Sequence, residues 1–232
     1  MQIKITNTLR VFKEGDVINF DFNKYPCTML VGPNGCGKST LINILRSYKC
    51  SNIKKGSPSL NYGDIKNFKN FAEIDCEFDN IYYLSSEYDD PLSMNNTYDA
   101  GAFWDNGGLQ LAHVSNGQRS QGLLYKFLTE NFKEDITIPE NSLVILDEID
   151  KGFDLKLQKG LHNLTNNLVK KGAKVLCVCH TPLPIMLADT VYNLNSKSYI
   201  SSQLYIFIQC GKWIEIKSMP DSTKPNNPDS NE

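Results

Sequence analysis

A glycine-rich segment with the residue types and spacing of a phosphate-binding loop occupies residues 32–39, and a helical pattern follows it. Glycines let backbone N–H groups turn inward onto phosphate oxygens, and the next helix points the positive end of its dipole at the same anion. We expect Lys38 to reach the β- and γ-phosphates of a nucleotide and the Ser39 hydroxyl to ligate Mg²⁺. The nucleotide-binding residues predicted here are Asn34, Gly35, Cys36, Gly37, Lys38, Ser39 and Thr40.

An acidic pair, Asp147 and Glu148, directly follows the apolar run 143–146. Parallel sheets place ligand-binding groups at the carboxyl ends of their strands. We therefore expect Asp147 to hold Mg²⁺ and Glu148 to act as the general base toward the attacking water. On its own such a pair is more often a solvated strand end, but the phosphate loop favours the functional interpretation.

A histidine, His180, ends another apolar run in the same way, and we predict that it contacts the γ-phosphate. Cys177 and Cys179 precede it with one residue between them. This spacing does not match the usual zinc pattern, and no second pair exists, so both are predicted to be core cysteines. His113 and His162 have no comparable context and are interpreted as ordinary residues.

The elements that must position these groups follow from hydrophobic periodicity. Apolar runs at 28–31, 143–146 and 175–179 predict buried strands, and a helix capped by Asp154 separates the last two, which is typical of a parallel βαβ unit. Alternating residues predict strands in the first 22 residues, and the segment 85–113 receives no assignment. The other expected elements are strands at 72–78 and 81–84, helices from Ser39 and over 118–132, and a hairpin formed by 203–209 and 212–217.

Length and composition exclude several classes of protein. The chain has 232 residues, 41% of them hydrophobic and 22% charged, as in soluble globular proteins. No apolar run approaches the ~20 residues of a membrane span, and the N-terminus does not resemble a signal peptide. The odd number of cysteines, seven, favours reduced thiols and a cytoplasmic location. A net charge of −2 gives no support for binding to DNA.

The order of these motifs resembles that of the ABC ATPase superfamily. Residues 32–40, 114–119, 143–148, 150–154 and His180 resemble its Walker A, signature, Walker B, D-loop and H-switch in sequence. The resemblance implies an α/β P-loop NTPase fold with an ABC-type core. In that fold, the core has a mostly parallel sheet, antiparallel strands lie at the N-terminus, and a helical lobe carries the signature.

The first residues also resemble the RecF and SMC-type branch, in which an arginine at the place of Arg10 approaches the nucleotide of its own subunit. Two features depart from the superfamily pattern. Asn116 replaces the middle glycine of the signature, and asparagine tolerates left-handed backbone well. Ser85, Ser86 and Glu87 stand where the glutamine of the Q-loop is expected.

The resemblance implies that two copies of the chain complete each site. ATP would be sandwiched in a head-to-tail homodimer that forms on ATP binding, with Lys38 and the Mg²⁺ ligands from one chain. Ser115 and Gly117 of the other chain, at the start of a helix, would cap the γ-phosphate in trans. Hydrolysis removes the group that both chains hold, so ATP would switch their association.

The predicted layout is one ATPase domain over 1–217, with its core in 1–45 and 140–217, a lobe over about 46–139, and a disordered tail over 218–232. The favoured function is an ATP-dependent dimerisation switch that acts on a separate protein effector, in DNA repair or anti-phage defence. One alternative is the ATP-binding subunit of a membrane transporter whose spanning chain is separate. Another is a regulatory module that binds ATP with negligible turnover.

Overall fold

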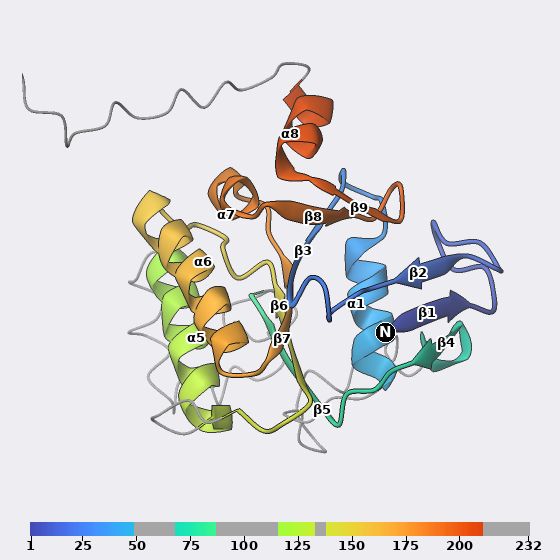
Figure 1. Ribbon diagram of the computed structural model, residues 1–232, viewed down its shortest axis with the longest axis horizontal. Coiled ribbons are helices and arrows are strands. Elements are labelled where there is room, and N and C mark those ends of the chain that lie inside the picture. The colour runs from blue at the N-terminus through green and yellow to red at the C-terminus, as the bar shows by residue number, and fades with distance from the viewer. Residues whose placement is uncertain (49–67, 87–115, 133–137, 211–232) are drawn as a thin grey trace, which may run out of the picture.

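Two β-sheets and the helices packed on them make up the described part of the chain, which covers residues 1–48, 68–86, 116–132 and 138–210 of the computed structural model (Figure 1). The larger sheet has six strands in the order β5-β6-β7-β3-β8-β9, and the smaller has three in the order β2-β1-β4. The strands are β1 (Gln2–Ile5), β2 (Val17–Asn19), β3 (Cys27–Val31), β4 (Ala72–Asp75), β5 (Asn80–Ser85), β6 (Ser142–Asp147), β7 (Lys174–Val178), β8 (Thr190–Asn193) and β9 (Ser198–Ser201). The helices are α1 (Lys38–Tyr48), η2 (Phe68–Asn70, a 3₁₀ turn), α5 (Asn116–Phe132), α6 (Leu155–Lys170), α7 (Pro182–Leu187) and α8 (Ser202–Cys210).

The larger sheet is parallel from β5 to β8, and only β9 runs antiparallel. Strand β7 lies between β3 and β6, with Val178 opposite both Leu30 and Asp147. The carboxyl ends of these three strands therefore meet at one edge of the sheet. The predicted strands at 28–31, 143–146 and 175–179 and the α/β fold with a mostly parallel sheet are confirmed.

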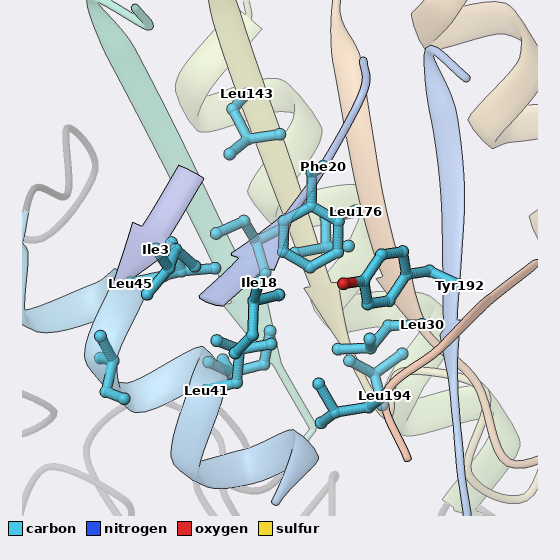
Figure 2. Close-up of a cluster of buried hydrophobic side chains, with 14 of the residues drawn as sticks. Ile3, Ile18, Phe20, Leu30, Leu41, Leu45, Leu143, Leu176, Tyr192 and Leu194 are labelled. Carbon is cyan, nitrogen blue, oxygen red and sulfur yellow. The ribbon is translucent and has the colours of Figure 1, made fainter. Parts of the chain in front are cut away.

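Each face of the larger sheet carries its own apolar core. On one face, α1 and the antiparallel sheet cover the strands, and Figure 2 shows Ile3, Ile18 and Leu41 in one cluster with Leu176 and Tyr192. On the other face, α5, α6 and α7 pack against the sheet. The central strands β3, β6 and β7 are buried on both sides, which explains their continuous apolar runs.

Helix α6 begins at the predicted cap and ends at a glycine with left-handed backbone. The backbone N–H of Leu157 donates to Oδ1 of Asp154 at 2.8 Å, so this aspartate is the N-cap. At the other end, Gly172 has φ +96°, and the N–H of Ala173 donates to the carbonyl of Leu168 at 3.1 Å. The helix buries Leu161, Thr165 and Leu168 on its inner stripe.

The predicted hairpin of 203–209 and 212–217 is wrong in its first strand, because residues 202–210 form helix α8. At the start of the helix, the N–H of Leu204 donates to Oγ of Ser201 at 3.2 Å. This side-chain cap was not recognised in the sequence, because the residues that follow it are mostly apolar. A hydrophobic run of this length has no clear period, so helix and strand cannot be separated by pattern alone. The second predicted strand lies outside the described residues.

Four further elements were not predicted, namely η2, α7, β8 and β9. Strands β4 and β5 fall inside 46–139, the expected lobe, yet they belong to the two sheets, so this stretch contributes to the core as well. The predicted tail at 218–232 and nearly all of the unassigned segment 85–113 lie outside the described residues. Across the part of the chain that the structure describes, no helix has the length and apolarity required to span a membrane.

The cap of α6 gives a test of the fold. We expect Asp154→Ala to lower the free energy of unfolding by about 1 kcal/mol, because the N–H of Leu157 loses its acceptor. Asp154→Ser keeps an acceptor and should cost much less. Urea denaturation followed by circular dichroism measures both variants. Equal stabilities for the alanine and serine variants would contradict the assigned cap.

Candidate functional site

The loop of residues 32–37 turns tightly between β3 and α1, as the phosphate-loop prediction requires. Gly35 and Gly37 have φ of +81° and +101°, a backbone conformation that favours glycine. The ammonium of Lys38 lies inside the turn and donates to the carbonyls of Gly32 at 2.7 Å and Pro33 at 3.2 Å. Lys38 is nearly buried, so its charge is held at the loop.

The N-terminal turn 9–12 packs directly on this loop. A Cβ added to Gly37 would lie 2.6 Å from Cγ2 of Val11 and 2.8 Å from Cζ of Phe12, so no larger residue fits there. Arg10 sits in the same turn with φ +54°, and its guanidinium is 6.0 Å from the ring centre of Phe68. The structure thus places Arg10 on an exposed turn beside the phosphate loop, and its nucleotide contact stays a prediction.

Asp147 lies at the end of β6 and is almost fully buried. Tyr83 of β5 donates its hydroxyl to Oδ2 of Asp147 at 3.0 Å. The guanidinium of Arg46 in α1 lies 4.6 Å from the ring centre of Tyr83, so Tyr83 contacts an arginine through its ring and a carboxylate through its hydroxyl. Tyr83 was not predicted, because nothing local in the sequence marks a tyrosine that orients a carboxylate 64 residues away.

The backbone of Glu148 is in the left-handed region, with φ +54°. Three hydrogen bonds hold it there: its N–H donates to the carbonyl of Val178 at 3.0 Å, and its carbonyl accepts from Oγ of Ser86 at 2.7 Å and from the N–H of Lys151 at 3.3 Å. A glutamate with positive φ is uncommon and persists only where its surroundings fix it. Ser86 stands where the Q-loop glutamine was expected, and its described role is to anchor the backbone of Glu148.

The side chains of Glu148 and His180 form a pair, with Oε1 and Nε2 2.8 Å apart. The ammonium of Lys151 lies 3.6 Å from Oε2 of Glu148. The hydrogen bond from His180 lowers the pKa of Glu148, and the same bond raises the pKa of His180 above its usual value. The structure therefore brings together the acid and the histidine that the sequence analysis chose separately.

A second carboxylate lies behind this pair. Asp150 is fully buried, and its Oδ2 accepts hydrogen bonds from the backbone and side chain of Thr181 and from the backbone of His180. Asp150 belongs to the segment that resembles the D-loop, and no role of its own was predicted for it. Its partners lie about 30 residues away in sequence, so no local pattern could have revealed them.

Helix α5 begins at Asn116, and its first turn packs against the turn that follows Glu148. A Cβ on Gly117 would lie 2.5 Å from the carbonyl oxygen of Gly152, and Oγ of Ser120 donates to the carbonyl of Lys151 at 3.3 Å. Gly117 is thus required by a contact within its own chain. Its action in trans stays a prediction, and Ser115 lies outside the described residues.

Helix α8 reaches the phosphate loop from the other side. Tyr205 makes a hydrogen bond with the backbone of Gly32, and burial raises the pKa of its hydroxyl. Cys177 and Cys179, by contrast, are buried in the apolar cluster under α6, as predicted for core cysteines. In the described ranges, no group of three or more His, Cys, Asp and Glu side chains could hold a metal ion.

The residues at this edge can bind and act on a phosphate ester. Lys38 and the loop N–H groups supply positive charge and donors, and Glu148 supplies an ionised carboxylate at neutral pH. The resemblance implies Mg²⁺, which prefers oxygen ligands and commonly takes one or two from the protein and the rest from phosphates and water. The oriented carboxylate of Asp147 and the exposed hydroxyl of Ser39 fit that ion.

A family model described as "AAA domain" matches residues 2–50, which include β1, the phosphate loop and α1. Three solved structures are similar to this chain. MJ0796, an ATP-binding cassette solved as a dimer in a post-hydrolysis state with ADP and Pi, is 16% identical with a TM-score of 0.44, over 86% of this chain and 98% of that one. A second structure, of the dimeric bacterial ABC transporter cassette MJ0796, is 14% identical with a TM-score of 0.45, over 86% of this chain and 98% of that one.

The cassette MJ1267 of an ABC transporter is 18% identical with a TM-score of 0.44, over 86% of this chain and 87% of that one. No curated protein sequence matches the chain. The family-model match and the described fold both support the resemblance to ABC ATPases, and the RecF and SMC-type branch stays a prediction. By its mostly parallel sheet and its phosphate loop, the described chain has the α/β fold of a P-loop NTPase.

The Glu148–His180 pair makes a prediction about pH. We expect His180 to titrate above its usual pKa of 6.5 in the nucleotide-free protein, and Glu148→Gln to return it toward that value. The attraction stabilises the fold fully between the usual pKa values of Glu and His, 4.5 and 6.5. It is lost as the pH rises through the raised pKa of His180 or falls through the lowered pKa of Glu148.

NMR titration of the imidazole signals measures the pKa of His180 in both proteins, and His162 is an internal control. Burial lowers the pKa of His162, so its signal should titrate below 6.5 in both proteins. A His180→Gln spectrum assigns the signals. The pair would be refuted by a His180 signal with the same pKa in the wild type and in Glu148→Gln.

Proposed function

We propose that the chain is an ATP-binding and ATP-hydrolysing ABC-type ATPase in which ATP controls the association of two copies. The single observation that carries this proposal is the meeting of three chain segments at one sheet edge. They are the glycine loop with Lys38, the Asp147–Glu148 pair and His180. Each has the chemistry that one part of a nucleoside triphosphate and its attacking water would need.

In this proposal, Lys38 and the loop N–H groups bind the β- and γ-phosphates. In the structure, the ammonium of Lys38 donates to two loop carbonyls. Phosphate oxygens would replace these carbonyls as acceptors, because hydrogen bonds between a cation and an anion are stronger than those to a neutral carbonyl. Ser39 and Asp147 would hold Mg²⁺, which neutralises charge on the phosphates when bound. Tyr83 orients Asp147 for this task through its hydroxyl.

Glu148 would accept the proton of the attacking water, or orient that water, because its lowered pKa keeps it ionised at neutral pH. His180, with its raised pKa, would present positive charge toward the γ-phosphate while its ring holds Glu148 in place. The fixed left-handed backbone of Glu148 supports this role, since a strained residue at a candidate site is a sign of function.

The proposed partner in each site is a second copy of the chain. The first turn of α5 lies against its own turn at Lys151 and Gly152, and Ser115 and Gly117 would act on the ATP of the other copy in trans. Loss of the γ-phosphate on hydrolysis would loosen the pair of chains. A separate protein effector would then respond to this cycle in the cytoplasm, in DNA repair or defence.

The proposal is tested with Glu148→Gln. We expect kcat to fall at least about 100-fold, because the general base is lost, while ATP binding persists. The variant should therefore accumulate as an ATP-bound dimer in size-exclusion chromatography with light scattering, in the presence of ATP and Mg²⁺ but not of ADP.

The control is Lys38→Ala, which should lose ATP binding and remain monomeric with ATP. A Glu148→Gln protein that stays monomeric with bound ATP would contradict the dimerisation switch. Unchanged ATP affinity in Lys38→Ala would contradict the phosphate-loop assignment. Wild-type protein that binds ATP and does not hydrolyse it would favour the regulatory-module alternative.

A further inference from the structure

Asp150 is a fully buried carboxylate that the proposed chemistry does not use. An ionised carboxylate inside a protein is costly unless hydrogen bonds compensate for its lost hydration. Asp150 follows Glu148 by two residues in sequence, in the turn that leaves β6. The contacts that balance its charge should therefore indicate why it is placed there.

Those contacts converge on one oxygen. Oδ2 of Asp150 accepts from the N–H of His180 at 3.0 Å, from the N–H of Thr181 at 2.7 Å and from Oγ1 of Thr181 at 2.6 Å. Bonds of this length to a carboxylate are charge-assisted and about twice as strong as neutral ones. Among the residues that the structure describes, Oδ1 of Asp150 has no donor, so the compensation runs through the segment 180–181.

Thr181 is placed for this contact at the expense of a helix cap. It is the N-cap residue of α7, where a threonine hydroxyl normally accepts from a backbone N–H of the first turn. Here it makes no cap bond, and its hydroxyl donates to Asp150 instead. The sequence therefore directs this side chain toward the carboxylate rather than toward its own helix.

The Asp150 hydrogen bonds join two segments, the turn after β6 and residues 180–181. The turn carrying Asp150 is held against α5 by Ser120 and against β7 by the bond from Glu148 to Val178. The residue pair 180–181 lies just beyond β7, past the last ladder hydrogen bonds, so Asp150 supplies the acceptor for both of its N–H groups. Fixing the backbone of His180 fixes the origin of its ring, whose Nε2 lies 2.8 Å from Oε1 of Glu148.

We propose that Asp150, acting through Thr181 and the backbone of His180, is a positioning residue that holds the His180 ring against Glu148. This inference rests on the proposed function, because the positioned pair is its hydrolytic machinery. Asp150 itself contacts neither nucleotide nor water in this account. Its loss should reduce turnover and leave the binding of ATP by the phosphate loop unchanged.

Two substitutions of Thr181 distinguish the effect of losing its hydroxyl from a general loss of stability. Thr181→Val removes the donor with little change in volume, and Thr181→Ser keeps it. We expect kcat to fall about 10-fold in Thr181→Val and about 100-fold in Asp150→Ala, since small displacements of catalytic groups cost this much. The KM for ATP should stay at the wild-type value in both, and Thr181→Ser should retain the wild-type kcat.

A matched control is Thr165→Val, which removes another buried threonine hydroxyl, the donor to the carbonyl of His162 on α6. Its kcat should equal that of the wild type. Equal kcat values in Thr181→Val and Thr181→Ser, or a fall in Thr165→Val as large as in Thr181→Val, would overturn the positioning role.

A second measurement is independent of turnover. Amide hydrogen exchange of His180 and Thr181, in nucleotide-free protein, should speed up in Asp150→Ala and in Asp150→Asn relative to the wild type, with the amides of β3 unchanged. Unchanged exchange at both residues would overturn the inference. If the wild type hydrolyses no ATP, the proposed function fails, and this exchange experiment still decides whether Asp150 positions His180.

Discussion

The parallel register of β3, β7 and β6 is the constraint on which the whole site depends. Val178 lies opposite both Leu30 and Asp147, so the glycine loop, the acidic pair and His180 leave the sheet at the same edge. A slip of one residue would turn Asp147 away from the face of α1 and would separate Glu148 from His180. The side chains of these strands pack into the two cores in this register, with Leu143, Ile145 and Leu176 on one face and Val144, Leu146 and Cys177 on the other.

On this frame, the site concentrates polar groups in a nearly apolar interior. Lys38, Asp147 and Asp150 are all buried, and each is compensated by hydrogen bonds to backbone or side-chain groups of a different element. Removing any member of such a network destabilises the fold, because a buried charge without partners loses its hydration and gains no hydrogen bonds in return. The strained backbone of Glu148 belongs to the same network, and its three anchors come from Ser86 just after β5, from β7 and from its own turn.

The sequence was sufficient for the parts of the fold that local pattern encodes. The glycine loop, the central strands and the cap at Asp154 all have short-range signatures, and the structure confirms them. Helix α8 was mistaken for a strand, since the cap at Ser201 is a single hydroxyl and the run after it is apolar throughout. Tyr83 and Asp150 could not be assigned roles, because their partners come from other segments, far away in sequence.

In the dimer that we propose, one ATP is held by the phosphate loop of one copy and by Ser115 of the other. The most direct measurement mixes two inactive proteins, Lys38→Ala and Ser115→Arg, and assays ATP hydrolysis. A mixed dimer contains one site with Lys38 from the second protein and Ser115 from the first, so we expect activity to appear on mixing and to rise with total protein concentration. A mixture no more active than its components, with both variants folded, would contradict it.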